Sequence, residues 1–146
     1  MNVTSQSFAH QGFLRERYTC RGENRNPAFE ISNIPSDAQS LALIMVDLDS
    51  PYQPAHWLVW NMDIATPKIY ENDIPSEATE GTNDFGEVGY KGPCPKDTVI
   101  HRYEFRFYAL KDELNLDESY LKHQLESEIK NLQIDMATMI AKYDGG

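Results

Sequence analysis

One stretch of the sequence, residues 41–61, constrains the fold more than any other part of the chain. It opens with the apolar run Leu41–Val46, which is too short for a globular helix and therefore predicts a strand covered on both faces. Asp47 and Asp49 end this run, and because side chains alternate along an extended backbone, both carboxylates are expected on one side, close enough to share a ligand, proton or cation. After a short loop, His56 begins a second strand-like run. A strand that ends in two acids beside a strand that begins with a histidine predicts the rim of a pocket.

A second strand with one buried face is predicted over residues 99–110, where polar and apolar side chains alternate most clearly. His101 and Tyr103 belong to the face that carries the aromatic residues, whereas Arg102 and Glu104 belong to the opposite face. We therefore expect His101 to point inward at the start of this strand, like His56 at the start of its own.

The tail, from residue 118 to residue 143, changes to a helical period. Asn131, which tolerates the left-handed conformation of a helix end, is a candidate break between two helices. The apolar residues that recur at steps of three and four are Leu121, Leu125, Ile129, Leu132, Met136, Met139 and Ile140. Strands first and helices last predict a single, mainly β domain over residues 1–146, with α-helices packed at one end.

A net charge of −10, from 13 basic and 23 acidic residues, sets the electrostatic character of the chain. Such a charge repels nucleic acid and anionic membranes, and no basic patch offsets it. Residues 1–12 lack the features of a secretory signal, and no run approaches the ~18 apolar residues of a membrane span. A disulfide between Cys20 and Cys94 could form but is not required, so we expect a cytoplasmic protein with two thiols.

Each candidate site residue also has an ordinary structural interpretation. Asp47 and Asp49 could accept backbone hydrogen bonds in a turn, and His56 and His101 could be structural histidines. The four together also resemble a transition-metal site, although no local ligand motif such as HExxH supports this. The aspartate pair resembles that of aspartyl phosphotransferases as well, but no phosphate-binding glycine loop accompanies it.

The segment from Gly92 through Pro93 and Cys94 to Pro95 has two interpretations. Its prolines preset the backbone and remove N–H donors, which suits a rigid connector. Alternatively it forms a pocket wall, because Gly92 permits close approach of a ligand and Cys94 keeps an N–H. A nucleophilic role for Cys94 is disfavoured, since nothing in its surroundings activates the thiol.

Several motifs in one order resemble the phosphatidylethanolamine-binding proteins, particularly their bacterial, Raf kinase inhibitor-like branch. They are RYTCRGENRNP near the start, DLDSP followed by AHWLVWNMD, then NDFGEVGYKGPCP and HRYEFRFYAL. The resemblance covers nearly the whole chain. It implies an antiparallel β-sandwich with C-terminal α-helices and a small anion pocket for phosphate-type groups, including the head group of phosphatidylethanolamine.

The resemblance also implies a set of ligand-binding residues. These are Asp47, Asp49, His56, Gly92, Pro93, Cys94, Pro95, His101 and Tyr103. Three positions depart from the family pattern: Leu48 stands between the acids in place of proline, Asn26 replaces a serine, and Lys96 replaces a second proline.

The function expected from these features is non-catalytic binding of a small phosphorylated or anionic ligand, without a cofactor or metal. Regulation of a protein partner such as a kinase and a homodimer built on the apolar helical stripe are further expectations. Binding is expected to be tighter below about pH 6.5, where imidazole is protonated. The alternative function is a metal-assisted hydrolase that uses Asp47, Asp49, His56 and His101.

Overall fold

A computed structural model describes residues 1–74 and 77–145. Within these residues the strands form two antiparallel sheets. The smaller sheet has the order β1-β2-β5, with β1 at Asn2–Thr4, β2 at Phe29–Ser32 and β5 at Lys68–Ile69. The larger has the order β6-β4-β3-β7-β8, with β6 at Thr79–Glu80, β4 at Ala55–Met62, β3 at Ser40–Asp47, β7 at Ile100–Leu110 and β8 at Gln133–Asp144. The predicted antiparallel, mainly β architecture is confirmed.

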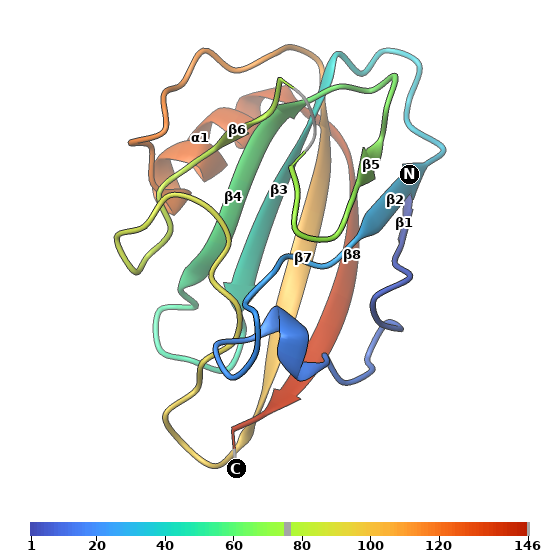
Figure 1. Cartoon of the computed structure of the whole chain (residues 1–146). Coiled ribbons are helices and arrows are strands. Elements are labelled where there is room, and N and C mark those ends of the chain that lie inside the picture. Colours follow the sequence, from blue (N-terminus) through green and yellow to red (C-terminus); the bar gives the residue numbers. More distant parts are fainter. Residues whose placement is uncertain (75–76, 146) are drawn as a thin grey trace.

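The larger sheet is the middle layer of three (Figure 1). The smaller sheet covers one of its faces, and the helix α1, Lys122–Leu132, covers part of the other. Along β3 the side chains of Leu41, Leu43 and Met45 enter the core between the sheets. Those of Ala42, Ile44 and Val46 enter a second core, to which α1 contributes Leu125 and Ile129. The prediction of a strand covered on both faces is therefore confirmed.

The sequence predicted two C-terminal helices, and the second of them is not present in the structure. Between residues 118 and 145 only α1 is helical, and the chain then continues as β8, which pairs antiparallel with β7 along most of its length. Met139, Ala141 and Tyr143 are buried on one face of β8, which is the two-residue period of a strand. The same segment also carries Met136 and Met139 at the three-residue spacing that suggested a helix. Pairing with the long partner strand β7 decides between the two periods, because tertiary contacts override weak local propensity.

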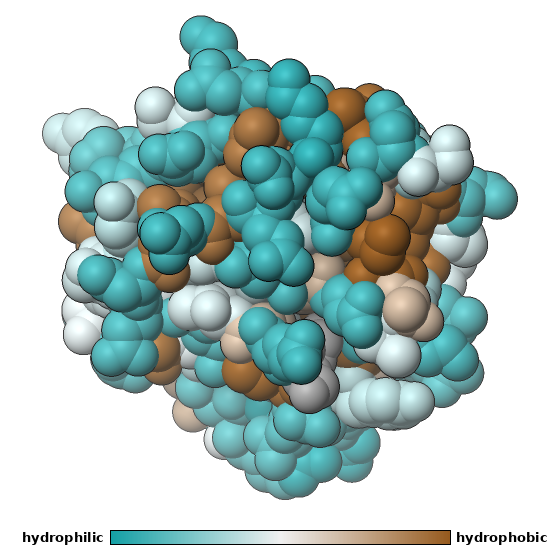
Figure 2. Space-filling model, turned by 90° about the horizontal axis from the view of Figure 1, so that it is seen from above, coloured by the Kyte–Doolittle hydropathy of each residue, from teal (hydrophilic) through white to brown (hydrophobic). Residues whose placement is uncertain are grey.

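The same correction removes the structural argument for a homodimer. Leu125 and Ile129 are buried beneath α1, and Met139 is buried between the sheets, so these residues do not form one open apolar stripe. Figure 2, which looks at the end of the molecule opposite the C-terminus, shows mostly hydrophilic side chains with hydrophobic areas between them. The homodimer stays a prediction.

One end of the larger sheet gathers the segments that the sequence marked as functional. The end of β3 lies beside the starts of β4 and β7, because Val46 pairs with Ala55 and Asp47 pairs with Tyr103. The β3–β4 loop, the loop before β7 and the 3₁₀ turn η1, Glu16–Tyr18, surround this end (Figure 1).

A disulfide joins Cys20 to Cys94 at this end, with Cα atoms 5.4 Å apart. The expectation of two free thiols is therefore wrong, and the cytoplasmic location inferred from them is not confirmed. Spacing alone could not reveal the bond, since 74 residues separate the two cysteines and only the fold brings them together. Within the described ranges, no helix is long and apolar enough to cross a membrane.

Candidate functional site

A pocket of about 440 Å³ opens at this end of the larger sheet. It lies among the end of β3, the starts of β4 and β7, the β3–β4 loop and the long segment between β6 and β7. The residues that line it are Asp47, Ser50, Pro54, His56, Phe85, Cys94, Pro95, Lys96, Asp97, His101 and Tyr103. Six of the nine ligand-binding residues predicted from the sequence are brought together here, namely Asp47, His56, Cys94, Pro95, His101 and Tyr103.

His101 lies between two carboxylates. Its Nδ1 is 2.8 Å from Oδ2 of Asp47, and its Nε2 is 2.9 and 2.8 Å from the two carboxylate oxygens of Asp97. Burial lowers the pKa of His101, but the hydrogen bonds to Asp97 and Asp47 outweigh burial, so the pKa is raised above its ordinary value. Each ring nitrogen faces a carboxylate, so the arrangement is that of an imidazolium that donates two hydrogen bonds.

Asp47 is the fixed member of this cluster. Its carboxylate accepts hydrogen bonds from the amide of Asp49 at 2.9 Å and from the hydroxyl of Ser50 at 2.8 Å, in addition to His101. All of its neighbours belong to the turn after β3 or to β7. The carboxylate at the end of the central strand is thereby buried and held by three hydrogen-bond donors.

His56 has a different environment on the other side of the pocket. Its Nδ1 lies 2.7 Å from the carbonyl oxygen of Lys91, which only accepts, so Nδ1 carries the proton and Nε2 keeps its lone pair. Burial lowers the pKa of His56 below its ordinary value despite this hydrogen bond. The ring packs edge-on against Phe85 and Tyr103, with centroids 4.8 and 5.3 Å away. His56 is therefore a neutral, aromatic wall of the pocket.

The hydroxyl of Tyr103 is buried. It completes no hydrogen bond among the described residues, and the carboxylate of Asp47 is a neighbouring acceptor. Burial and the neighbouring charge of Asp47 raise the pKa of Tyr103, so the hydroxyl keeps its proton at every ordinary pH. An unpaired buried hydroxyl is costly unless a ligand or water satisfies it. The wall of the pocket thus contains one buried donor that completes no hydrogen bond.

The prediction that Asp47 and Asp49 project to the same side is wrong. The backbone turns after Asp47, so the alternation of an extended strand does not reach Asp49. Asp49 lies outside the lining, where its two oxygens bind the guanidinium of Arg102 at 3.0 and 2.8 Å, and this hydrogen bonding lowers the pKa of its carboxyl. Asp49 thus fastens the turn to the outer face of β7.

Gly92 and Pro93 stand behind the wall rather than at its surface. A Cβ atom at Gly92 would overlap the carbonyl oxygen of Tyr18, so the close approach that this glycine permits is to the protein's own backbone. The amide of Gly92 donates to Oδ1 of Asn24 at 2.8 Å, and the carbonyl of Pro93 accepts from Cys20 at 3.2 Å. Both residues position Cys94 and Pro95, which do line the pocket.

The geometry does not favour the metal-assisted alternative. Among the residues described, no three His, Cys, Asp or Glu side chains are placed to hold one metal ion. Asp49 is bound by Arg102, and the proton-bearing nitrogen of His56 is bound by a carbonyl. The four residues invoked for the hydrolase therefore do not form one ligand set.

Five lining residues were not among the predicted ligands: Ser50, Pro54, Phe85, Lys96 and Asp97. Asp97 is the most important because it contacts His101 directly. In the sequence, Asp97 stands four residues before His101, and this proximity is the one feature that could have suggested a contact. The surrounding segment has no periodicity from which the direction of the side chain could be predicted. Loop residues of this kind acquire their partners only through the fold.

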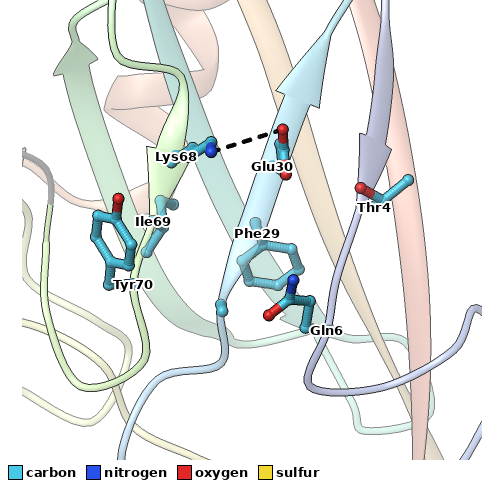
Figure 3. A pocket seen from close by; sticks show the side chains of 8 residues that line it. Thr4, Gln6, Phe29, Glu30, Lys68, Ile69 and Tyr70 are labelled. Atoms are coloured by element: carbon cyan, nitrogen blue, oxygen red, sulfur yellow. Dashed lines mark ion pairs between the residues drawn. The ribbon is translucent and has the colours of Figure 1, made fainter.

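A second hollow lies on the smaller sheet and is shown in Figure 3. Its volume is about 110 Å³, a quarter of that of the main pocket. Lys68 and Glu30 lie at its upper side, with Nζ 3.9 Å from Oε1, and Phe29 forms part of its wall. The charge of the lysine is already balanced, so this hollow is the weaker candidate for a charged ligand.

Comparisons with known proteins identify the family and the fold. Residues 4–144 match the family model described as phosphatidylethanolamine-binding protein. A UPF0098 protein of Methanothermobacter thermautotrophicus is 36% identical with full coverage of both chains, and one of Chlamydia muridarum is 35% identical over 99% of each.

Two solved structures share the fold. A putative phosphatidylethanolamine-binding protein homologue from Chlamydia trachomatis, CT736, has a TM-score of 0.92 and 33% identity, covering 98% of this chain and 96% of its own. Escherichia coli YbcL, described as a new member of the mammalian family, also has a TM-score of 0.92, with 26% identity over 98% and 97% of the two chains. The chain described here belongs to the phosphatidylethanolamine-binding protein family.

Proposed function

We propose that this protein is a non-catalytic binding protein whose pocket takes a small phosphate-type group, such as the phosphoethanolamine head group. The observation that carries the proposal is a pocket lined by two donors: the hydroxyl of Tyr103, which completes no hydrogen bond, and His101, whose pKa is raised by carboxylates. Phosphate oxygens accept hydrogen bonds from such donors, and charged donors form the stronger bonds. His101 supplies the charged kind once a ligand replaces one of the carboxylates that it now contacts.

The size and charge of the pocket suit a small charged group. A volume of about 440 Å³ lies within the range of small-molecule sites, roughly 300–1,000 Å³. Lys96 adds a second cation to the lining, while Asp47 and Asp97 add two anions. A zwitterion such as phosphoethanolamine matches this mixture, since its phosphate faces the donors and its ammonium group faces a carboxylate.

The arrangement of the acids and bases supports binding rather than turnover. Both nitrogens of His101 already donate to carboxylates, so this residue has no lone pair to accept a proton from a nucleophile. The hydroxyl of Ser50 donates to Asp47, and Cys94 is bonded to Cys20. None of these groups is an activated nucleophile.

The test is calorimetric titration with phosphoethanolamine and with inorganic phosphate. Tyr103→Phe is expected to lower the affinity about tenfold, because a hydrogen bond to a charged group contributes roughly 1.5 kcal/mol. Tyr108→Phe is the matched control, since Tyr108 lies on the same strand but packs into the core beneath α1. Equal affinities of the wild type and Tyr103→Phe would contradict the proposal.

Regulation of a protein partner such as a kinase is a more specific proposal, and only the family resemblance supports it. A competition experiment tests whether it uses this pocket. Phosphoethanolamine that displaces a bound kinase would support regulation through the pocket, and retention of the kinase at saturating ligand would contradict it.

A further inference from the structure

We propose that the carboxylate of Asp97 is an internal ligand of the pocket, which occupies the anion position at Nε2 of His101 and leaves when an external anion binds. This inference rests on the function proposed above and adds the residue that controls access to the site. Asp97 belongs to none of the motifs that the sequence analysis singled out.

The contact has the geometry of a bound anion. Both oxygens of Asp97 lie within hydrogen-bond distance of Nε2, at 2.9 and 2.8 Å, so the carboxylate faces this single N–H with both acceptors. A phosphate group likewise presents negatively charged oxygen atoms to an N–H donor. The one nitrogen of His101 that Asp47 does not bind is therefore already occupied by an anion from the chain itself.

The two carboxylates around His101 differ in how firmly they are held. The side chain of Asp47 is 5% exposed, whereas that of Asp97 is 52% exposed. Asp47 has three hydrogen-bond donors around it, while Asp97 has His101 and the amide of Val99, at 3.1 Å. Asp97 is the exposed end of its pair with the buried His101, so its carboxylate is hydrated when it leaves, whereas Asp47 has no such access to water.

The segment that carries Asp97 permits such a movement. Residues 96–99 form bends outside any strand and are exposed, between the disulfide at Cys94 and the start of β7 at Ile100. Rotation of one exposed side chain in this segment leaves the disulfide, β3 and β7 in place. No rearrangement of the sheet is needed to open the position.

Charge makes simultaneous occupancy unfavourable. Asp47, Asp97 and a phosphate would place three anions around one imidazolium, with Lys96 as the other cation of the lining. Like charges in a partly buried site repel each other strongly. An incoming anion therefore replaces Asp97, and the apparent affinity is reduced by the fraction of molecules in which Asp97 is bound.

The experiment compares the binding of inorganic phosphate to the wild type, Asp97→Asn and Glu87→Gln by calorimetry at one pH and ionic strength. Asp97→Asn keeps the size of the side chain but removes its charge. If Asp97 leaves Nε2 of His101 free in about one tenth of wild-type molecules, and the variant leaves it free in all of them, the variant is expected to bind phosphate about tenfold more tightly. Glu87→Gln is the matched control, because it removes one negative charge from a side chain whose ion pair is with Lys91, 3.9 Å away, and not with His101. Its affinity is expected to change less than about twofold, since exposed charges are screened by salt.

Each outcome decides something different. A wild type that binds phosphate while Asp97→Asn binds no more tightly would overturn this inference and leave the proposed function intact. Equal gains in both variants would overturn it as well, because the effect would then be one of net charge. Failure of all three proteins to bind would overturn the proposed function together with this inference.

Carbon-detected NMR of the aspartate carboxyl groups gives an independent readout on the folded wild type. Phosphate is expected to shift the Asp97 signal toward that of an unpaired carboxylate and to leave Asp49, bound by Arg102, unchanged. Saturation with phosphate without movement of the Asp97 signal would show that the contact persists in the complex and would overturn the inference.

Discussion

The two histidines of the pocket make the most informative comparison in this molecule. His56 lies at the start of β4 and His101 at the start of β7, the two strands that flank the central strand β3. Both histidines are almost fully buried. The pKa of His56 is nevertheless lowered, while that of His101 is raised. Burial alone would lower both, so the difference comes from the partners: a neutral carbonyl for His56 and two carboxylates for His101.

The walls that carry these histidines also differ in how they are held. His56 lies within β4, hydrogen-bonded into the sheet between β3 and β6. The wall before His101, residues 94–99, is a loop whose main fixed point is the disulfide to Cys20. One wall is thus fixed by the sheet, and the other largely by a crosslink.

The largest expected effect comes from removing that crosslink. A Cys20→Ser, Cys94→Ser double variant should lose about 4 kcal/mol of unfolding free energy, because the bond closes a span of 74 residues in the unfolded chain. Urea unfolding monitored by the fluorescence of Trp57 and Trp60 on β4 measures the loss. Reductant should have no effect on the double variant, and a loss below about 1 kcal/mol would mean that the loop is held by its other contacts.

A smaller effect is expected from the carboxylate that anchors His101. Asp47→Ala should cost about 3 kcal/mol, because it leaves the buried imidazolium without its fixed partner. Asp49→Ala, two residues away, should cost no more than about 1 kcal/mol, since its pair with Arg102 is on the surface. Equal costs in urea unfolding would contradict the distinction between the two aspartates.

The smallest effect expected is on the pH dependence of stability, where the two histidines act in opposite directions. Above pH 6.5 the folded protein keeps a proton on His101 that the unfolded chain releases, so stability falls as pH rises through the raised pKa. Below pH 6.5 the unfolded chain gains a proton that folded His56 excludes, so stability falls as pH drops toward the lowered pKa. These two groups together place a maximum near pH 6.5.

Urea midpoints of the wild type, His101→Gln and His56→Gln between about pH 5 and pH 9 separate the two contributions. His101→Gln should flatten the alkaline side of the maximum, and His56→Gln the acidic side. Loss of both sides in one variant would show that the histidines titrate as a coupled pair. The same raised pKa implies that anion binding through His101 extends above pH 6.5 rather than ending there.

The sequence predicted the two strands of the larger sheet that have the clearest side-chain patterns, β3 and β7. Alternation placed His101 and Tyr103 on the buried face of β7, and the apolar run Leu41–Val46 was correctly assigned to a doubly covered strand. The same rule failed at Asp49, because the chain leaves the extended conformation one residue earlier. Period two applies only as long as the strand does.

Other features depended on contacts that no local pattern carries. The helical spacing was right for Leu125 and Ile129 but wrong for Met139, where pairing with β7 forms a strand instead. Asp97 lies in a loop without periodicity, so its contact with His101 follows from the path of that loop across the pocket. The disulfide between distant cysteines depends on the fold in the same way.

The position of β8 has a consequence for solubility. It is the terminal strand of the larger sheet, and its outer edge near the pocket is covered by residues 11–14, which exchange backbone hydrogen bonds with Ile140 and Lys142 at 2.7–2.8 Å. An uncovered edge of this length is a template for pairing with another chain, which leads to aggregation. The segment 11–14 therefore prevents this part of β8 from pairing with a strand of another chain, and the net charge of −10 adds long-range repulsion that high salt would remove.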